Sequence, residues 1–559
     1  MASRLDILPS LDAVQKAVSS SSNSPNPPNL IPLVAPISAD ILTPTSIYLK
    51  LTAKSQSKLS FLFESAGTTG TIGRYSFVGT GPRKVIQTGP GFGEETDPLP
   101  ILQQELSKFR VAQIPGLRLP PLIGGGIGYV GYDCVKYFEP KTKRDMSDPL
   151  KIPESFFMLF DTVVAVDHFF QLVQVITFLR VPEDGNLERA YEEGSKVLRE
   201  MVSILRSEET PLPPQGPIVP NQEAVSNIGQ SGYENHVKVL RKHIMKGDII
   251  QCVPSQRYAR PTSLHPFNIY RELRTVNPSP YLFFVDCQDF QLVGASPEVL
   301  VKSEQGRIVT HPIAGTVKRG LSLEEDDELA EQLRNSLKDR AEHVMLVDLA
   351  RNDVNRVADP LSTKVDRLMI VQRFSHVQHL TSEVSGVLRQ GKTRFDAFRS
   401  IFPAGTTSGA PKVRAMELIA ELEGEKRGVY AGAVGYFGYD SVAENGQVSE
   451  GAMDTCIALR TMLVKGGIAY LQAGGGIVFD SDPYEEYVET INKLGASMQT
   501  IARAEKKHLE AQAQQKETKA GAEPAVAPMT SIGEQGRDDA GLVNGEPPRR
   551  TNAHVDLAA

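Results

Sequence analysis

The segment GGGIGYVGYD at residues 124–133 has a near copy, AGAVGYFGYD, at residues 431–440, and the two agree at six of ten positions. Apolar and aromatic residues interrupted by glycines are typical of strands that another backbone or a ligand approaches closely. The repetition fits either an internal duplication or two similar solutions to one local geometry. The first copy also contains G-x-G-x-x-G, but the following YDCVKYFEP does not resemble a helix that opens on glycines, which argues against a dinucleotide site.

Composition changes along the chain divide it into five predicted segments. We expect a disordered lead-in at 1–36, which is rich in Ser, Pro and Asn, and a proline-rich linker at 207–227. Between them, 37–206 contains short β-like runs and a closing helix, and 228–506 alternates helical and strand patterns. Beyond it, 507–559 is predicted to be a helical extension followed by a disordered tail. Periodicity alone gives an α+β fold class.

Charge and cysteine content exclude several classes of protein. The 559 residues carry 60 Lys and Arg against 67 Asp and Glu, a net charge of −7, so we expect no nucleic-acid partner. The four cysteines lie far apart without a CxxC pair, which argues against zinc sites and disulfides and predicts a reducing, cytoplasmic location. The most apolar stretch, 156–181, contains acidic and amide residues and predicts a β-hairpin rather than a membrane span.

Acidic residues at helical spacing occur in two distant segments. In LKDRAEHVMLVDLARND (337–353), Asp339 and Glu342 are three residues apart, and in DPYEEYVETINKLG (482–495) so are Glu486 and Glu489. Four carboxylates from two helices are suited to one magnesium ion, which binds one or two protein carboxylates and keeps positions for water and substrate oxygens. From the spacing alone, two solvated helix faces are the more common explanation.

Groups suited to a carboxylate ligand follow in the last third of the chain. QAGGGIVFD (472–480) interrupts a β-like run with Gly474, Gly475 and Gly476, whose exposed N–H groups can bind an anion, although a strand bulge would look the same. Arg460 lies in the otherwise apolar run IALRTML, predicted to be a strand, and its guanidinium can bind a carboxylate through two hydrogen bonds. No phosphate loop is found, so the sequence favours a small carboxylate-bearing ligand over a nucleotide.

Many ordered motifs together resemble the chorismate-utilising enzymes, most closely their anthranilate synthase component I branch. They are DIIQCVPSQR, NPSPYLFF, GASPEVLV, HPIAGTVKRG, DRAEHVMLVDLARNDV, SHVQHLTSEVSG, IFPAGTTSGAPKVRAMELI, GAVGYF, DTCIALR and QAGGGIV. The resemblance covers roughly residues 37–505. It implies a large α/β sandwich of two packed antiparallel β-sheets with helices outside. It also makes 228–506 the chorismate-binding catalytic domain and 37–206 a regulatory, tryptophan-binding region.

The resemblance assigns roles to individual residues. Glu342, Glu489 and Glu486 are expected to hold Mg²⁺, with Asp339 in a supporting position. The residues expected to bind chorismate are Gly315, Thr316, Tyr436, Arg460, Gly474, Gly475 and Gly476. His379 is the expected general acid, which would protonate the departing C4 hydroxyl. Asp339 or a neighbouring carboxylate is a candidate for the base that removes the C2 proton, and Thr316 completes the catalytic group.

Two positions distinguish the sibling reactions. Ala314 stands where aminodeoxychorismate synthases typically carry a nucleophilic lysine, and Gln251 where isochorismate and salicylate synthases carry a lysine that activates water. Both differences favour a lyase that forms anthranilate and pyruvate from chorismate and ammonia, the first committed step of tryptophan biosynthesis. The alternatives are an aminodeoxychorismate synthase component I or a catalytically silent amino-acid sensor.

The resemblance also implies regulation and a partner. FLFESAG (61–67) resembles the tryptophan-binding segment, with Ser65 as a contact joined by Pro280, Tyr281 and Leu282. Since no GxCxG glutaminase motif is present, ammonia derived from glutamine is expected to come from a separate amidotransferase subunit. The chain departs from the family pattern at Asp339, where a glutamate is common, and at Ser441–Gly451, which lengthens a hairpin.

Overall fold

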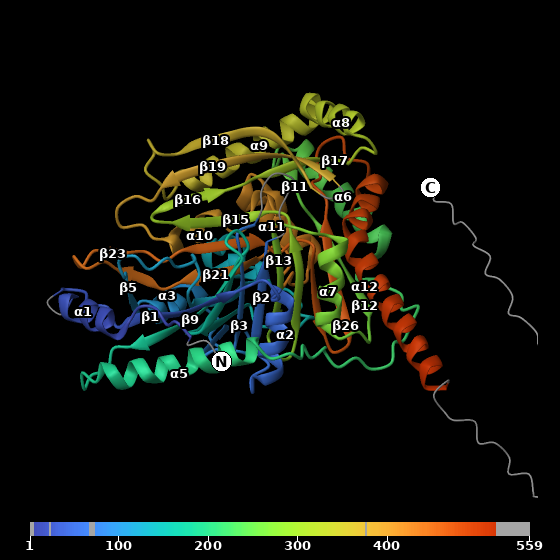
Figure 1. Ribbon diagram of the computed structural model, residues 1–559. Helices are drawn as coiled ribbons and strands as arrows, with labels where there is room; N and C mark the ends of the chain where they lie inside the picture. Colours follow the sequence, from blue (N-terminus) through green and yellow to red (C-terminus); the bar gives the residue numbers. More distant parts are fainter. Residues whose placement is uncertain (1–4, 22–23, 66–72, 375–376, 521–559) are drawn as a thin grey trace, which may run out of the picture. The chain divides into compact units, whose positions relative to one another are not determined.

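Two large β-sheets pack against each other with helices on their outer faces (Figure 1). The computed structural model describes residues 5–21, 24–65, 73–374 and 377–520. The chain separates into two units, Met1–Leu509 and Glu510–Ala559, and both sheets belong to the first. The predicted sandwich of antiparallel sheets is confirmed, with two exceptions: β5 pairs in parallel with both β1 and β22.

The larger sheet has 14 strands within the described residues. In spatial order they are β10 (Val225–Ser226), β12 (Ser255–Pro261), β26 (Ile468–Gly474), β25 (Thr461–Lys465), β14 (Gln291–Ser296), β13 (Tyr281–Asp286), β2 (Ser60–Glu64), β3 (Tyr75–Thr80), β8 (Val163–Asp167), β9 (Leu172–Arg180), β1 (Leu30–Ser38), β5 (Arg110–Ala112), β22 (Asp440–Val442) and β23 (Val448–Ser449). Its strands come from both halves of the chain. The hairpin predicted within 156–181 is confirmed as β8 and β9.

The smaller of the two packed sheets contains ten strands within the described residues. Their order is β17 (Ile313–Lys318), β19 (Val377–Val387), β16 (Arg307–Thr310), β15 (Val299–Glu304), β24 (Met453–Ile457), β21 (Ala433–Gly438), β6 (Gly125–Val130), β7 (Ser155–Phe160) and β4 (Lys84–Thr88), with β18 (Lys364–Arg373) paired to β19. A separate two-stranded sheet joins β11 (Gln251–Cys252) to β20 (Gly409–Ala410).

Helices cover the outer faces of the sandwich. They are α1 (Leu11–Ser21), α2 (Pro44–Lys54), α3 (Pro98–Leu106), α4 (Val135–Phe138), α5 (Leu187–Leu205), α6 (Gly229–Met245), α7 (Pro266–Val276), α8 (Leu323–Asn335), α9 (Leu337–Asn355), α10 (Arg394–Ile401), α11 (Lys412–Glu423) and α12 (Pro483–Ala520), with 3₁₀ turns at Tyr132–Cys134, Pro140–Thr142 and Gly405–Thr407. Helices α2, α5 and α7 pack on the larger sheet, whereas α3 and α10 pack on the smaller one. No helix of the described residues combines the length and apolarity needed to cross a bilayer.

The two similar glycine-rich segments are adjacent strands. β6 and β21 pair antiparallel with Gly128 opposite Gly435, and both strands lie inside the smaller sheet. A Cβ on Gly128 would lie 1.8 Å from the Phe156 carbonyl oxygen, and one on Gly435 would lie 2.1 Å from the Asp454 carbonyl oxygen. Close approach of neighbouring backbones therefore requires glycine at both positions.

The predicted segment boundaries need three corrections. The lead-in at 1–36 is not disordered throughout, because Leu11–Ser21 is helical and Leu30–Ser38 pairs along its length with β9. Its Ser/Pro/Asn-rich composition concealed the apolar run that begins at Leu30. The segments 37–206 and 228–506 are not separate compact units, since their strands alternate within both sheets.

The third correction concerns the linker at 207–227. Residues 207–224 contain no helix or strand, as the prolines predict, but the segment is not free of the protein. Ile218 is buried in the core, and the Gln215 side chain accepts hydrogen bonds from the His265 N–H and Asn268 Nδ2. The helical extension after residue 506 continues to Ala520, and the predicted disordered tail beyond it lies outside the described residues.

Candidate active site

The acidic residues predicted from helical spacing lie in the opening turns of α9 and α12. Helix α9 begins after Ser336, whose hydroxyl accepts a hydrogen bond from the Asp339 N–H. Helix α12 begins at Pro483, as proline at a helix start predicts. A Cβ on Gly476 would lie 3.4 Å from Glu342 Oε1 on α9, and one on the adjacent Gly475 would lie 2.7 Å from Glu486 Oε2 on α12. The two acidic turns therefore face a common region.

Glu342 is held there as a poorly solvated carboxylate. Burial raises its pKa, and the nearby charges of Glu489 and Asp339 act in the same direction. The hydrogen bond from Gln251 Nε2 to Glu342 Oε1 at 2.7 Å and the positive charge of Lys493 stabilise the ionised form. A cation bound beside Glu342 would relieve both burial and repulsion.

Glu486 has an oxygen without a partner. Its Oε1 accepts a hydrogen bond from Ser481 Oγ at 2.7 Å, but its buried Oε2 has none. A Cβ on Gly475 would lie 2.7 Å from that oxygen, so glycine keeps the space beside it open. No cluster of three or more His, Cys, Asp or Glu side chains suited to a metal occurs among the described residues. The donors present nevertheless fit magnesium, which needs only one or two protein carboxylates.

Lys493 connects the acids to the glycine-rich segment. Its ammonium forms an ion pair with Glu489 at 2.6 Å and donates to the Gly474 carbonyl oxygen at 2.8 Å. Its own carbonyl oxygen accepts a hydrogen bond from Arg460 Nη1 at 2.6 Å. Gly476 lies close as well, because a Cβ there would be 3.4 Å from Glu342 Oε1.

Arg460 is not in a strand, contrary to the expectation from IALRTML. It lies between β24 and β25 with φ +49°, where the chain passes from the smaller sheet to the larger one. A charged side chain at this crossing avoids the strand interior, which explains why the apolar pattern was misleading. Burial lowers the pKa of its guanidinium.

His379 and Thr316 are opposite each other on β19 and β17. His379 Nδ1 lies 2.9 Å from Thr316 Oγ1 and 3.3 Å from the Gly315 carbonyl oxygen. Burial lowers the pKa of His379 to about 4, and the positive charge of Arg460 contributes to the shift. The imidazole is therefore neutral at pH 7.

Gly315 brings this strand pair toward α9. It has φ +76° at an irregularity of β17, and a Cβ there would lie 3.2 Å from both Cβ and Oδ1 of Asp339. A side chain would thus be strained as well as crowded. Through Gly315 and Arg460, the strand pair with His379 joins the same region as the acids and the glycines.

Tyr436 does not belong to this group, and Tyr430 takes its place. Tyr436 lines a different cavity, together with Tyr281. Burial raises the pKa of Tyr430 to about 12, whereas the nearby Arg460 guanidinium and a backbone hydrogen bond from Gly474 act in the opposite direction. The two tyrosines are six residues apart in VYAGAVGY, and only Tyr436 lies within β21. The sequence contains both tyrosines but nothing that shows where the strand begins.

Glu298 is a further candidate that the sequence reasoning missed. Burial raises its pKa to about 8, so its carboxyl is protonated at pH 7. Thr406 Oγ1 lies 3.2 Å from both carboxyl oxygens, and the N–H of Ile313, at the start of the strand that carries Gly315, also interacts with it. A single acid in the apolar run GASPEVLV was the available signal.

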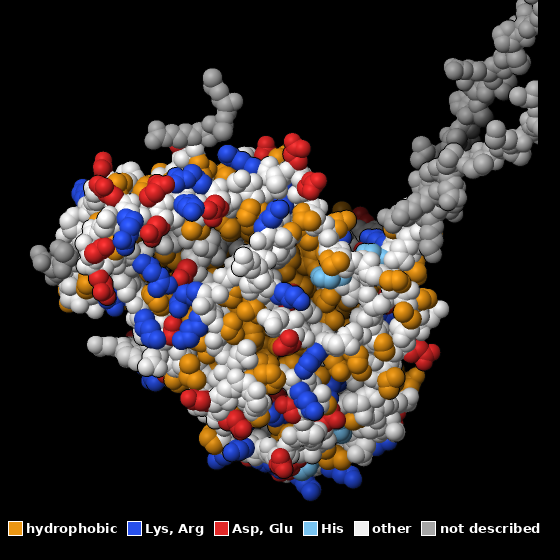
Figure 2. All heavy atoms as spheres, turned by 90° about the horizontal axis from the view of Figure 1, so that it is seen from below, with side chains coloured by type: hydrophobic (Ala, Val, Ile, Leu, Met, Phe, Trp, Pro, Cys, Tyr) orange, Lys and Arg blue, Asp and Glu red, His pale blue; other side chains and the backbone are white. Residues whose placement is uncertain are grey.

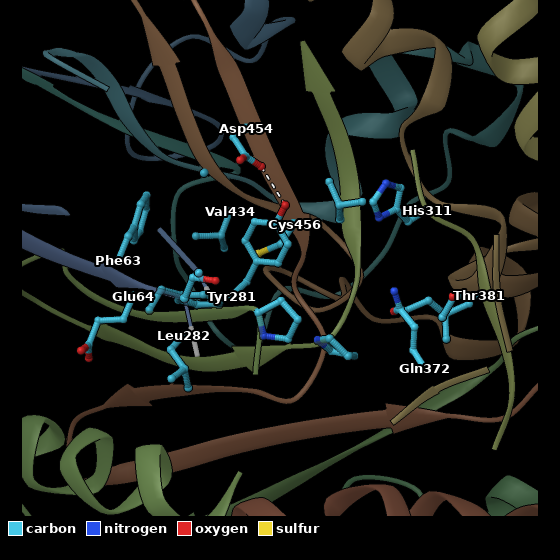
Figure 3. A pocket seen from close by; sticks show the side chains of 18 of the residues that line it. Phe63, Glu64, Tyr281, Leu282, His311, Gln372, Thr381, Val434, Asp454 and Cys456 are labelled. Carbon is cyan, nitrogen blue, oxygen red and sulfur yellow. Dashed lines mark hydrogen bonds between the residues drawn. The ribbon is translucent and has the colours of Figure 1, made fainter. Parts of the chain in front are cut away.

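A cavity of about 390 Å³ lies between the sheets and is lined by all four residues expected to bind tryptophan; Tyr281 and Leu282 are labelled in Figure 3. Ser65, Pro280, Tyr281 and Leu282 line it. The Tyr281 hydroxyl donates to Asp454 Oδ1 at 2.9 Å, which is the dashed line in Figure 3. The rest of FLFESAG, Ala66 and Gly67, lies outside the described residues. The volume and aromatic lining of the cavity suit a ligand of amino-acid size.

Glu64 also lines this cavity, and its negative charge is balanced by partners within the protein. The Tyr270 hydroxyl donates to Glu64 Oε2 at 2.5 Å, and Arg274 forms an ion pair with the same carboxylate at 2.7 Å. Both partners lie on α7.

On the protein surface, Figure 2 shows positive and negative side chains intermixed on the face in view, without a broad basic area there.

The comparisons with known proteins agree with this geometry. The family described as chorismate binding enzyme matches residues 58–499. The chain belongs to the chorismate-binding enzymes. It is 59% identical over 511 residues to anthranilate synthase component 1 of Saccharomyces cerevisiae, covering 90% of this chain and 98% of that protein. It is 53% identical over 482 residues to the probable anthranilate synthase component 1 of Schizosaccharomyces pombe, covering 86% and 95%.

Solved structures of chorismate-binding enzymes share the fold. Anthranilate synthase component I from Streptococcus pneumoniae matches with a TM-score of 0.65 and 38% identity, covering 76% of this chain and 92% of that one. The menaquinone-specific isochorismate synthase of Escherichia coli matches with a TM-score of 0.64 and 18% identity, covering 88% and 100%. At that identity the second match supports the fold alone.

Proposed function

We propose that this chorismate-binding enzyme is the large component of anthranilate synthase. It would convert chorismate and ammonia to anthranilate and pyruvate. The observation that carries the proposal is the convergence of the α9 and α12 acids, the 474–476 glycines, Arg460 and the His379–Thr316 pair on one region. The identity to two fungal proteins of that name over nearly their full length supports it.

Local positive charge would bind the substrate, because a chain of net charge −7 cannot attract a dianion by its overall field. Arg460 and Tyr430 would bind one carboxylate. Glu342, Glu489 and Glu486 would hold Mg²⁺, with Asp339 nearby. When bound, the ion would act as a Lewis acid and neutralise the other carboxylate. The unpartnered oxygen of Glu486 and the raised pKa of Glu342 support this assignment.

The reaction needs a proton donor, since hydroxide is a poor leaving group. His379 is the donor implied by the family resemblance, and Thr316 would orient its ring through the contact at Nδ1. A histidine of pKa about 4 carries no extra proton at neutral pH. Glu298, whose carboxyl retains a proton up to about pH 8, is a second candidate, although the small pocket that it lines with Thr406 and Pro312 includes none of the residues grouped above. Asp339 remains a candidate for the base that removes the C2 proton.

Direct attack by ammonia is supported by two side chains. Ala314 lies on β17 without an amine, and Gln251 uses its amide to hold Glu342. Neither position can supply the lysine chemistry of the sibling enzymes. Ammonia would come from glutamine through a separate amidotransferase subunit. Tryptophan, occupying the cavity of Ser65 and Tyr281, would act as the feedback inhibitor.

Product identification tests the proposal. The isolated chain, given chorismate, ammonium and Mg²⁺, should form anthranilate and an equal amount of pyruvate, measured by fluorescence and a coupled assay. Glutamine should not replace ammonium. Aminodeoxychorismate without pyruvate would indicate the sibling activity instead, and no turnover would indicate the silent sensor. His379→Gln should lower kcat by about 10²-fold or more while leaving the fold intact.

A further inference from the structure

Tyr233 reaches the glycine-rich segment from α6. Its ring is fully buried in an apolar cluster with Val237, Leu240 and Ile477. Its hydroxyl is the acceptor for the Gly475 N–H at 2.9 Å and lies 3.4 Å from the Pro254 carbonyl oxygen. Burial raises the pKa of this phenol well above its usual range, so the group stays neutral and cannot serve as an ionised ligand.

This contact changes the role of one of the three glycines expected to bind the substrate. The Gly475 N–H is already engaged by Tyr233, so it is not free to bind a carboxylate. The Tyr233 hydroxyl and Glu486 lie on the same side of Gly475, because a single Cβ there would lie 2.7 Å from Glu486 Oε2 and 3.3 Å from the Tyr233 hydroxyl. With Lys493 bound to the Gly474 carbonyl oxygen, the segment is fixed at two successive residues.

We propose that Tyr233 is a positioning residue for substrate binding, acting through its hydrogen bond to Gly475. The inference rests on the proposed function, in which the 474–476 segment faces chorismate. Without the hydroxyl, the buried Gly475 N–H loses its partner and the segment must shift to find another. The expected loss is in binding that is common to the ground and transition states, which raises KM more than it lowers kcat.

Steady-state kinetics of Tyr233→Phe with ammonium and Mg²⁺ test this role. We expect the KM for chorismate to rise about tenfold with kcat within about twofold of the parent. Tyr129→Phe is the matched control, because it removes another buried hydroxyl, which donates to the Pro153 carbonyl oxygen at 2.7 Å far along the chain from the glycines. Gly475→Ala, which crowds Glu486, should raise KM in the same way.

The experiment distinguishes failure of the Tyr233 role from failure of the proposed function. An unchanged KM in Tyr233→Phe, with normal parent turnover, overturns the inference alone, and so does an equal rise in Tyr129→Phe. Absence of turnover in the parent overturns the proposed function and this role together. Thermal unfolding and tryptophan binding, followed by indole emission, check that each variant is folded.

A different set of contacts links the cavity to α12 through α7. Tyr270 and Arg274, four residues apart on one face of α7, bind Glu64 at the cavity. Between them in sequence, the buried carboxylate of Glu272 forms ion pairs with Arg503 at 2.9 Å and Lys507 at 2.5 Å on α12. Helix α7 thus contacts Glu64 of the cavity wall through one face, and it contacts α12 through Glu272 on another face.

Both ends of this connection bear on proposed ligand sites. Helix α7 ends at Val276, four residues before Pro280 of the cavity and five before Tyr281. Helix α12 carries Glu486 and Glu489 near its start and Lys493 one turn later. A displacement of α7 on ligand binding would therefore be transmitted to the helix that supplies the acids.

We infer that Glu272 is a positioning residue that couples the cavity to the acidic site. This second inference depends on tryptophan being an inhibitor, as proposed above. Coupling between two sites is separate from affinity at either one. Loss of the Glu272 ion pairs should thus leave tryptophan binding intact while weakening its effect on turnover.

Glu272→Gln tests the coupling by two measurements on the full chain. Since the protein contains no tryptophan, indole emission reports only added ligand. We expect its dissociation constant to stay within about twofold, while the half-inhibitory concentration rises about fivefold or more. Glu105→Gln is the matched control, a buried acid paired with Arg83, Lys84 and Lys108.

The coupling role is overturned if the dissociation constant and the half-inhibitory concentration of Glu272→Gln change together. It is also overturned if neither of them changes. An equal loss of inhibition in Glu105→Gln also overturns it. If the parent chain binds no tryptophan or is not inhibited by it, the regulatory part of the proposed function fails, and this inference fails with it.

Discussion

The cavity around Ser65 and Tyr281 lies between the two sheets and is lined by apolar, aromatic and polar side chains, whereas the region around Glu342 and Gly475 carries the charges of two helices. The carboxylates that line the cavity have partners, since Glu64 is paired with Arg274, Asp454 accepts from Tyr281, and Glu383 lies 3.4 Å from His311 Nε2. In the acidic region, burial destabilises the charge of Glu342, and Glu486 keeps an unpartnered oxygen.

This difference teaches that the two sites have different requirements. An apolar cavity between sheets is formed by the fold itself, because strand register fixes its walls. A cluster of poorly solvated carboxylates needs a counter-charge before it is stable. We therefore expect changes at the acidic region to abolish activity and changes at the cavity to alter regulation only.

The largest expected effect comes from Glu342→Gln. Loss of this carboxylate should lower ammonium-dependent turnover by about 10³-fold or more, because a bound Lewis acid contributes several kcal/mol to the transition state. Calorimetry should show weakened Mg²⁺ binding, and tryptophan binding in the cavity should be unchanged. Glu304→Gln, at the exposed end of β15 where the carboxylate pairs with Lys302, is a control of the same charge change. Turnover within tenfold of the parent would remove Glu342 from the metal site.

A smaller, pH-dependent effect is expected at Glu298. With a pKa of about 8, its carboxyl is protonated below that pH, so proton donation and kcat/KM should decline as pH rises through 8. Glu298→Gln should remove this alkaline limb and lower the optimum about 10²-fold. The pH–rate profiles of this variant and His379→Gln decide between the donors. Retention of the alkaline limb in Glu298→Gln would leave His379 as the sole candidate.

At the cavity the expected effect is about tenfold. Ser65→Ala removes a hydroxyl that lines the cavity, and a hydrogen bond at the upper end of the usual range is worth about 1.4 kcal/mol, which is a factor of about ten in affinity. Tryptophan should bind about tenfold more weakly by indole emission, with basal turnover unchanged. Equal binding in both proteins would mean that Ser65 does not touch the ligand, and a fall in basal turnover would contradict the separation of the two sites.

The smallest expected effect is on stability, and it distinguishes Gly495 within α12 from Gly475. Gly495 is a helical glycine with nothing within 4 Å of its Cβ position, unlike Gly475, whose Cβ would clash with Glu486. Gly495→Ala should increase the free energy of unfolding by about 1 kcal/mol, because alanine is the better helix former. Denaturant unfolding measures the gain, and turnover should not change. Destabilisation by Gly495→Ala would show that this part of the helix is more constrained than its surroundings indicate.

The sequence predicted the secondary structure that holds the site better than it predicted the site. The helix expected over 337–353 is found as Leu337–Asn355, and Pro483 begins α12 as expected. Local periodicity and helix-start residues determine such elements directly. Arg460 and the lead-in were predicted wrongly because neighbouring composition does not show where a chain changes sheets or joins a distant strand.

By itself the sequence determined the helices that carry the acids, the glycine-rich strands and the membership in the chorismate-binding enzymes. Only the tertiary structure decided which tyrosine accompanies Arg460, which carboxyl keeps its proton and which glycine amide Tyr233 occupies. The reason is physical. Helix and strand formation depend on residues a few positions apart, whereas burial, pKa and hydrogen-bond partners depend on groups brought together from hundreds of residues away.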